Sequence, residues 1–290
     1  MAQVEYLTDD LHSANLPPWP RHITRALAWH FQDVAHVAKA SSTTIPPTNW
    51  YDDPYTGKSA FYGASRTDAD RMARDGWQDG AKRAAALRER LSIERPRTPK
   101  LARWDVAGAV PNVARALSGN PLNMRRLAPR EANASPILTL IYDMAAFAVI
   151  AAKAMEANAI AAAAITDQLE DAGFACEITT LHRAAQGTFA CEVAAIVKQA
   201  HAPITLAAAV YGMGHPAYKR RHIFALECNE PKARPLTERL GLSMELMPDP
   251  ARDIFIIPSA QKTNTTNPID AFDAQIAGLR AQGCPGIPAA

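Results

Sequence analysis

No apolar run in this 290-residue chain reaches the roughly 18 residues that a membrane-spanning helix needs. The first ten residues, MAQVEYLTDD, are acidic and lack the basic and then apolar order of a signal peptide. We therefore expect a cytoplasmic protein without a membrane partner.

Cysteine is scarce, and its spacing excludes two common uses of the thiol. The four residues Cys176, Cys191, Cys228 and Cys284 form no CxxC pair, which argues against a zinc knuckle and against a redox motif. Cys176 and Cys191 could face each other across a hairpin, but reduced thiols are expected in a reducing compartment.

Catalytic signatures are also missing: the chain has no HExxH, no GxSxG and no paired-carboxylate element. The tetrapeptide TGKS that ends at Ser59 resembles the end of a phosphate-binding loop, but Asp52 occupies the position that requires glycine. We therefore predict no catalytic residue, no metal and no cofactor, and we expect a protein that is not an enzyme.

Two weaker arrangements of histidine stay open. Cys191 and His182 could pair within a hairpin, although a buried thiol beside a surface histidine is the commoner arrangement. His215 and His222 lie about two helical turns apart and could share a metal, but no third ligand accompanies them.

What the sequence does contain is an uneven distribution of charge. The chain is 48% hydrophobic and 21% charged, as in globular proteins, with a net charge of +2. Residues 66–130 hold 15 basic and 7 acidic residues, whereas residues 131–290 hold 12 and 16. An anionic partner would therefore bind the middle of the chain.

Apolar periodicity divides the chain into two predicted domains, 1–130 and 131–290. All five tryptophans precede residue 105, and the first region is predicted to be mainly helical, with helices over 21–40, 65–95 and 111–117. The second region alternates apolar β-rich runs with helical stretches. The strands are predicted at 137–142, 174–181, 188–197 and 253–258, and the helices at 147–172, 203–213, 216–227 and 267–282.

This order predicts an α/β fold with a doubly wound, mixed and mostly parallel sheet. Its first strand ends in the run Ile141-Tyr142-Asp143-Met144-Ala145-Ala146-Phe147, which resembles the start of a von Willebrand A domain. That family would place hydroxyl residues at positions 145 and 147, and here Ala145 and Phe147 cannot coordinate Mg²⁺. The resemblance therefore implies the scaffold of that family with its metal site lost.

The whole chain also resembles an uncharacterised group of bacteriophage proteins. The resemblance rests on Phe61-Tyr62-Gly63 with Ser65 and on three longer runs, 73–80, 105–111 and 119–124. Some of these proteins are similar to factors that bring a phage RNA polymerase to single-stranded DNA. The resemblance implies a transcription cofactor in the host-cell cytoplasm, with single-stranded DNA or that polymerase as its partner.

The basic segment supplies the candidate nucleic-acid contacts, because arginine can bind phosphate and tryptophan can stack on bases. These residues are Arg74, Trp77, Lys82, Arg83, Arg88, Arg90, Arg97, Lys100, Arg103, Arg125 and Arg126. In the alternative interpretation the aromatic residues form a core and the arginines are solvated or paired with nearby aspartates.

A protein-interaction scaffold is the second functional hypothesis, for example one that binds an ATPase or a virion protein. Recognition would then use the carboxyl ends of the strands and a neighbouring basic cluster. The candidate surface residues are Asp143, Lys219, Arg220, Arg221 and Ser259.

Overall fold

The structure is a computed structural model of the 290-residue chain. It describes residues 3–8, 16–20, 22–41, 61–89, 102–107, 110–127, 135–230, 233, 243–248 and 253–287. Within this part of the chain, no helix has the length and apolar character required to cross a membrane.

A six-stranded sheet forms the centre of the fold, in the order β1-β2-β8-β7-β6-β9. Its strands are β1 (Gln3–Thr8), β2 (Arg25–Phe31), β6 (Ile137–Asp143), β7 (Ala175–Gln186), β8 (Phe189–Lys198) and β9 (Ile254–Ile257). The pairs β2/β8, β7/β6 and β6/β9 are parallel, and the pairs β1/β2 and β8/β7 are antiparallel. The prediction of a mixed, mostly parallel sheet is confirmed.

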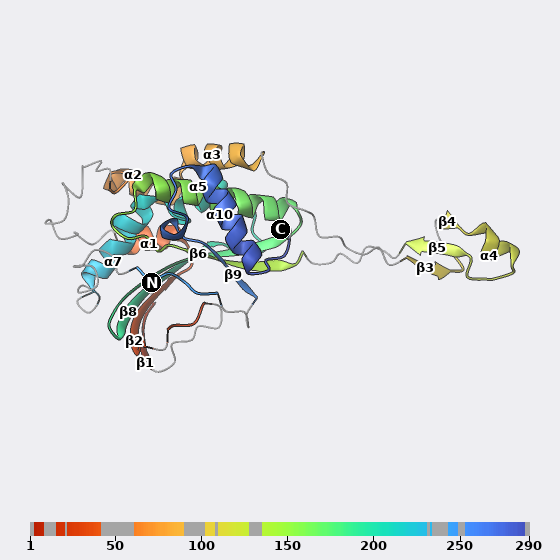
Figure 1. The fold of residues 1–290 in the computed structure, drawn as a ribbon, viewed down its shortest axis with the longest axis horizontal. Helices are drawn as coiled ribbons and strands as arrows, with labels where there is room; N and C mark the ends of the chain where they lie inside the picture. Colours follow the sequence, from red (N-terminus) through yellow and green to blue (C-terminus); the bar gives the residue numbers. More distant parts are fainter. Residues whose placement is uncertain are drawn as a thin grey trace.

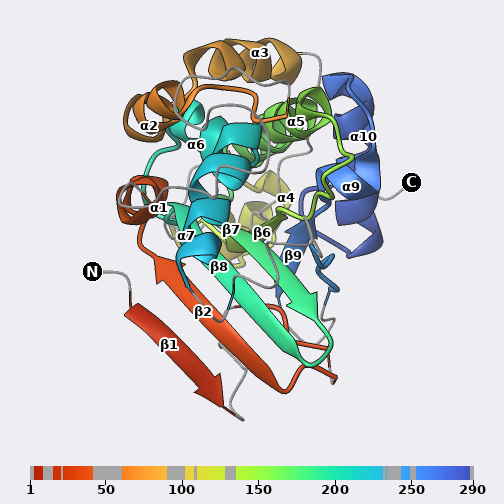
Figure 2. The ribbon, with the colours of Figure 1, turned by 90° about the vertical axis from the view of Figure 1, so that its left-hand side faces the viewer.

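The helices gather on one face of this sheet (Figure 2). They are α1 (Val34–Ser41), α2 (Arg66–Asp75), α3 (Gln78–Arg88), α5 (Ala152–Asp171), α6 (Leu206–Gly212), the π-helix η1 (Tyr218–Ile223), α7 (Phe224–Asn229) and α10 (Pro268–Ala281), while the short α9 (Ala260–Thr263) follows β9. Alternate strand residues, such as Leu140 and Val193, join the core under these helices.

Extended segments cover the opposite face where it is buried. Leu16 and Leu246 pack there against Ile141 and Leu181, and the described residues of this core include no helical residue. The prediction of a doubly wound sheet is therefore wrong, because such a sheet carries helices on both faces. The one-sided helical layer also differs from the scaffold that the von Willebrand A resemblance implied.

The predicted boundary at residue 130 is also wrong. β2 belongs to the first 130 residues, yet it pairs with β8 from Arg25↔Phe189 to Phe31↔Ala195. The predicted helix over 21–40 is in fact this strand followed by α1. Its apolar residues Leu27 and Phe31 fit helical spacing as well as strand alternation, and pairing with β8 decides between the two.

Most of the other predicted elements are confirmed, with shifts of a few residues at their ends. The interruption at Gly76 separates α2 from α3, as predicted, and Gly173 follows the end of α5. The predicted helix over 147–172 begins only at Ala152, because residues 144–151 form a loop in which Arg220 donates to the carbonyl oxygen of Ile150.

Residues 102–127 form a small separate unit that we call the strand module (Figure 1). It has a three-stranded antiparallel sheet, in the order β3-β5-β4, and a short helix, where the predicted region was mainly helical. Its elements are β3 (Ala102–Asp105), β4 (Val110–Pro111), α4 (Val113–Leu117) and β5 (Met124–Leu127). None of the module side chains whose burial the structure describes is buried.

Gly76 is the position where a side chain is expected to harm the fold most directly. Its φ is +77°, and an added Cβ would lie 2.6 Å from the backbone carbon of Ala207. The substitution Gly76→Ala should therefore lower the free energy of unfolding by about 2–4 kcal/mol, through left-handed strain and overpacking.

Urea denaturation followed by circular dichroism measures this loss. Gly173→Ala is the matched control, since Gly173 also has a positive φ of +100° but an added Cβ there would meet no atom within 4 Å. Equal losses in the two variants would show that contact with Ala207 contributes nothing.

Candidate functional site

The carboxyl end of β6 is the position where an open α/β sheet commonly binds ligands. From β6 the chain passes through α5 to β7 on one side, while β9 pairs with β6 on the other side. Asp143 ends β6 and Ser259 lies just beyond β9, so the two predicted residues occupy neighbouring positions of this edge.

The side chain of Asp143 at this edge is buried and already has backbone hydrogen-bond partners. Asp143 Oδ1 accepts a hydrogen bond from Ala145 N at 2.9 Å, and Oδ2 accepts one from Leu246 N at 3.2 Å. Burial raises the pKa of Asp143 to about 6. The cavity beside it, lined by Tyr142, Met155 and others, holds about 10 Å³, which is room for one water molecule.

Lys219 lies entirely inside the protein beneath the same edge. Its Nζ donates to the carbonyl oxygens of Met144 and Ala146, at 2.8 and 2.9 Å, and to Ser243 Oγ at 2.8 Å. Burial lowers the pKa of Lys219 to about 7. This lysine therefore joins the segment after β6 to the segment around Ser243.

Arg220 and Arg221 are also buried, and each holds a loop. Arg220 donates to the carbonyl oxygens of Phe61 and Ile150, both at 2.6 Å, and Arg221 Nε donates to the carbonyl oxygen of Ala64 at 2.8 Å. Their guanidinium groups lie over the rings of Phe61 and Tyr62 at 4.0 and 4.1 Å.

The prediction of a partner surface at Asp143, Lys219, Arg220, Arg221 and Ser259 is therefore wrong, because all five residues are buried. A run of three cations predicts an exposed helix face. Here the cations satisfy backbone carbonyl groups that would otherwise lie unpaired in the interior.

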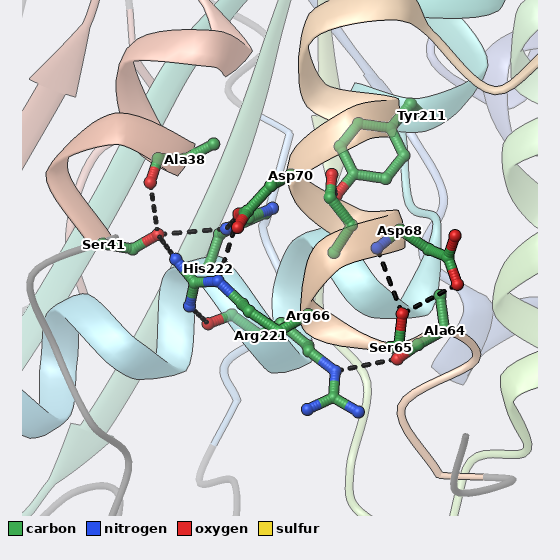
Figure 3. Close-up of polar contacts among 11 residues, drawn as sticks. Ala38, Ser41, Ala64, Ser65, Arg66, Asp68, Asp70, Tyr211, Arg221 and His222 are labelled. Atoms are coloured by element: carbon green, nitrogen blue, oxygen red, sulfur yellow. Dashed lines mark hydrogen bonds and ion pairs between the residues drawn. The ribbon is translucent and has the colours of Figure 1, made fainter. Parts of the chain in front are cut away.

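The buried Ser41 and His222 form, with the half-buried Asp70, a cluster that resembles a hydrolytic triad in composition (Figure 3). Ser41 Oγ lies 3.0 Å from His222 Nδ1, and His222 Nδ1 lies 3.8 Å from Asp70 Oδ1. Ser41 donates its proton to the carbonyl oxygen of Ala38 at 2.8 Å and accepts from Arg66 Nη2 at 2.9 Å.

This arrangement does not activate a nucleophile. Burial, foremost, lowers the pKa of His222 to about 3, with the Arg66 and Arg221 cations adding to the shift. Both Ser41 and His222 have no exposed surface, so a substrate has no route to the hydroxyl group. The cluster instead joins α1, α2 and η1.

Cys191 and His182 do come close to one carboxylate, Glu227, which the sequence did not indicate. Glu227 Oε1 lies 3.1 Å from Cys191 Sγ and 3.0 Å from His182 Nε2. Burial and this carboxylate raise the pKa of Cys191 well above its ordinary value, so it remains a thiol. The expected surface histidine is buried, and we infer a core contact rather than a catalytic pair.

No group of three or more His, Cys, Asp or Glu side chains suited to a metal ion occurs within the described ranges. His215 and His222 are both buried, and burial lowers the pKa of each to about 3. His215 Nδ1 accepts a hydrogen bond from Ala217 N at 3.1 Å.

Acidic residues of α5 neutralise two arginines of the predicted basic helix face. Arg83 Nη1 lies 3.7 Å from Glu156, and Arg88 contacts both Asp167 and Asp171. These contacts support the alternative interpretation, in which arginines are paired rather than free for phosphate.

The other predicted nucleic-acid contacts on this face differ in their burial and their partners. Trp77 is half-buried and packs edge-on against His215, with ring centroids 4.7 Å apart. Arg74 and Lys82 are exposed, with no ion pair to any side chain in the described segments. Three predicted contacts, Arg90, Arg97 and Lys100, lie outside the described residues.

The last three candidates, Arg103, Arg125 and Arg126, fall on the strand module, where only their backbone is described. The antiparallel ladder pairs Arg103 with Arg126 and Trp104 with Arg125. The Arg115 guanidinium lies 4.5 Å from the centroid of the Trp104 ring. The structure thus brings four arginines and one tryptophan together in one small unit.

The fold and these sites define a mixed α/β protein with a closed sheet edge and a separate basic strand module. A model of the domain of unknown function DUF7192 matches residues 15–277, and the chain therefore belongs to that family. No curated protein and no solved structure matches the chain.

Proposed function

We propose that this is a non-enzymatic binding protein that contacts single-stranded nucleic acid through the strand module. The observation that carries the proposal is the charge of this module. Residues 102–127 contain four arginines and one acidic residue, Asp105. Phosphate groups are the partner that such an excess of guanidinium groups attracts.

The strand register concentrates this charge. Arg103 and Arg126 occupy directly opposed positions of an antiparallel pair, an arrangement that is unfavourable between like charges unless an anion lies between them. Trp104 is exposed beside Arg115 and offers a ring for a base to stack on. On α3, by contrast, the arginines already have carboxylate partners.

The biological setting is proposed from the sequence resemblance alone. The motifs around Phe61 and in the runs 73–80, 105–111 and 119–124 support a bacteriophage protein that acts in the host-cell cytoplasm. A transcription complex with a phage RNA polymerase is the setting that the resemblance favours.

Fluorescence anisotropy with a labelled single-stranded oligonucleotide tests the proposal. If the module arginines contact four phosphates, the logarithm of the binding constant should fall with the logarithm of salt at a slope of about −3. The double variant Arg103→Ala/Arg126→Ala should make this slope shallower by about 1.4, because two phosphate contacts are lost.

Arg71→Ala/Arg83→Ala is the matched control. It also removes two positive charges, but from arginines that already have carboxylate partners. Arg71 pairs with Asp68, and Arg83 pairs with Asp79 and Glu156. The proposal fails if no binding occurs at low salt, or if both double variants lower affinity equally.

A second candidate function, a protein-interaction scaffold, is favoured by a different observation. Exposed apolar side chains on the module, Val106, Val113, Leu117 and Leu122, suit a protein surface better than phosphate. Capture of a protein partner that is lost on deletion of residues 102–127 would support this function, and capture that is independent of the module would contradict it.

A further inference from the structure

The three most exposed large apolar side chains of the described chain, Val149, Leu117 and Met247, lie in two groups. The first, which we call the module patch, comprises Val113 and Leu117 on α4, which are 66% and 84% exposed. These residues are four apart and share one side of the helix. Arg115, between them, points to Trp104, so the module patch faces away from the module's sheet.

The second group, which we call the edge patch, comprises Phe147, Val149 and Met247, which are 39%, 88% and 72% exposed. Its residues belong to the segment that follows β6 and to the segment around Leu246. Two contacts hold its parts side by side: Leu246 N donates to Asp143, and Lys219 bonds both Ala146 O and Ser243 Oγ.

The module patch belongs to a unit in which none of the side chains with described burial forms a core. Since none of its described side chains is buried, the three short strands and α4 gain little from apolar burial. Such a small sheet needs another surface to pack against. In Figure 1 the module stands apart from the main sheet, so the patches of one chain do not cover each other.

The distribution of charge indicates which surface is complementary to the module. Residues 90–130 contain nine basic and two acidic residues, a net charge of +7, whereas the rest of the chain contains 22 basic and 27 acidic residues, a net charge of −5. Glu245, an exposed carboxylate, lies two residues before Met247 of the edge patch. The body of this same protein is therefore an acidic and partly apolar surface that suits the module.

We propose that the module patch of one chain docks on the edge patch of a second copy. In a dimer with a twofold axis, the module of each chain binds the edge patch of the other chain. Both copies of each apolar patch are then covered, and the dimer is closed. The open face of the module's sheet remains available, so this inference does not depend on nucleic-acid binding.

Sedimentation equilibrium over a concentration series tests the proposal. The wild-type chain should dimerise, and Val113→Asp/Leu117→Asp should weaken the dimer by about 100-fold, because two apolar anchors become charged. Val149→Asp, which alters the edge patch instead, should also weaken the dimer. Ile269→Asp is the matched control, because Ile269 is a 40% exposed residue outside both patches.

Mixing the two kinds of variant distinguishes reciprocal docking from other dimers. A chain with the altered module and a chain with Val149→Asp retain one intact contact between them, so the mixture should form more dimer than either variant alone. A dimer built from two modules or from two bodies would gain nothing on mixing.

A monomeric wild-type chain would overturn the proposal, as would a dimer that neither patch variant weakens. Dimerisation only when an oligonucleotide is added would assign the association to nucleic acid and would also overturn it. Circular dichroism of each variant shows that the main body is still folded, because none of the substituted residues is buried.

Discussion

Acidification from pH 6.5 towards pH 3 should remove much of the stability of this protein, because two buried histidines resist protonation. Burial lowers the pKa of both His215 and His222 from 6.5 to about 3. Between these values the unfolded chain binds a proton at each site and the folded chain does not. Their stabilising contribution is therefore complete above pH 6.5 and is lost as pH falls, on the order of 5 kcal/mol for each histidine.

One carboxyl group acts in the opposite direction. The pKa of Asp143 is raised from 3.8 to about 6, so the stability it contributes is present below pH 3.8 and is lost as pH rises through 6. This recovers on the order of 3 kcal/mol on acidification, less than the two histidines together lose. The net result is a protein that becomes less stable in acid.

The measurement is the free energy of unfolding in urea at several pH values between 7.5 and 4.5. His215→Asn should reduce the pH dependence by about 1.4 kcal/mol per pH unit, which corresponds to one proton. His201→Asn, at an exposed position, controls for the loss of an imidazole group. An unchanged slope in the His215 variant would refute the assignment, whatever its overall stability.

Arg183→Met should lower the free energy of unfolding by about 3–5 kcal/mol, the range for an ion pair broken inside a protein. Arg183 lies against Glu192 at 2.7 Å, and both side chains are about 97% buried or more. The same guanidinium donates to the carbonyl oxygens of Pro17 and Pro18 and lies 4.1 Å from the Trp19 ring centroid. Its loss leaves the Glu192 carboxylate paired with His30 and removes the hydrogen bonds to the carbonyl groups of Pro17 and Pro18.

A double-mutant cycle makes this prediction specific. Adding Glu192→Gln to Arg183→Met should cost less than the two single losses together, since the buried carboxylate is no longer left unpaired. Arg71→Met removes an exposed pair with Asp68 and should change stability by less than about 1 kcal/mol. Additive losses in the cycle would show that Arg183 acts through packing alone.

Local patterns were sufficient for the second half of the fold. The apolar run that begins at Ile137 is a strand buried in a parallel arrangement, and the hairpin around Gly187 joins β7 to β8. Asn267 caps α10 by accepting a hydrogen bond from Ile269 N, and Pro268 occupies its first turn. Each of these signals depends on neighbouring residues alone.

The candidate sites were predicted less well, for a common physical reason. The sequence predicts Lys219, Arg220 and Arg221 at the surface, because burial of a cation is costly. In the structure, carbonyl groups from other segments converge on these cations and remove that cost. In the same way, the carboxylates of α5 that pair with Arg83 and Arg88 are about 70 to 80 residues away in sequence.

The sequence by itself determined the mixed α/β class, the positions of most helices and strands after residue 130, and the basic charge of the middle segment. These follow from periodicity, capping residues and counts of ionisable groups, all of which depend on residues close together in the sequence. Only the tertiary structure decided that β1 and β2 extend the sheet beside β8, that the helices lie on one face, and that the cationic helix is internal. Those outcomes depend on contacts between distant segments, whose partners no local pattern identifies.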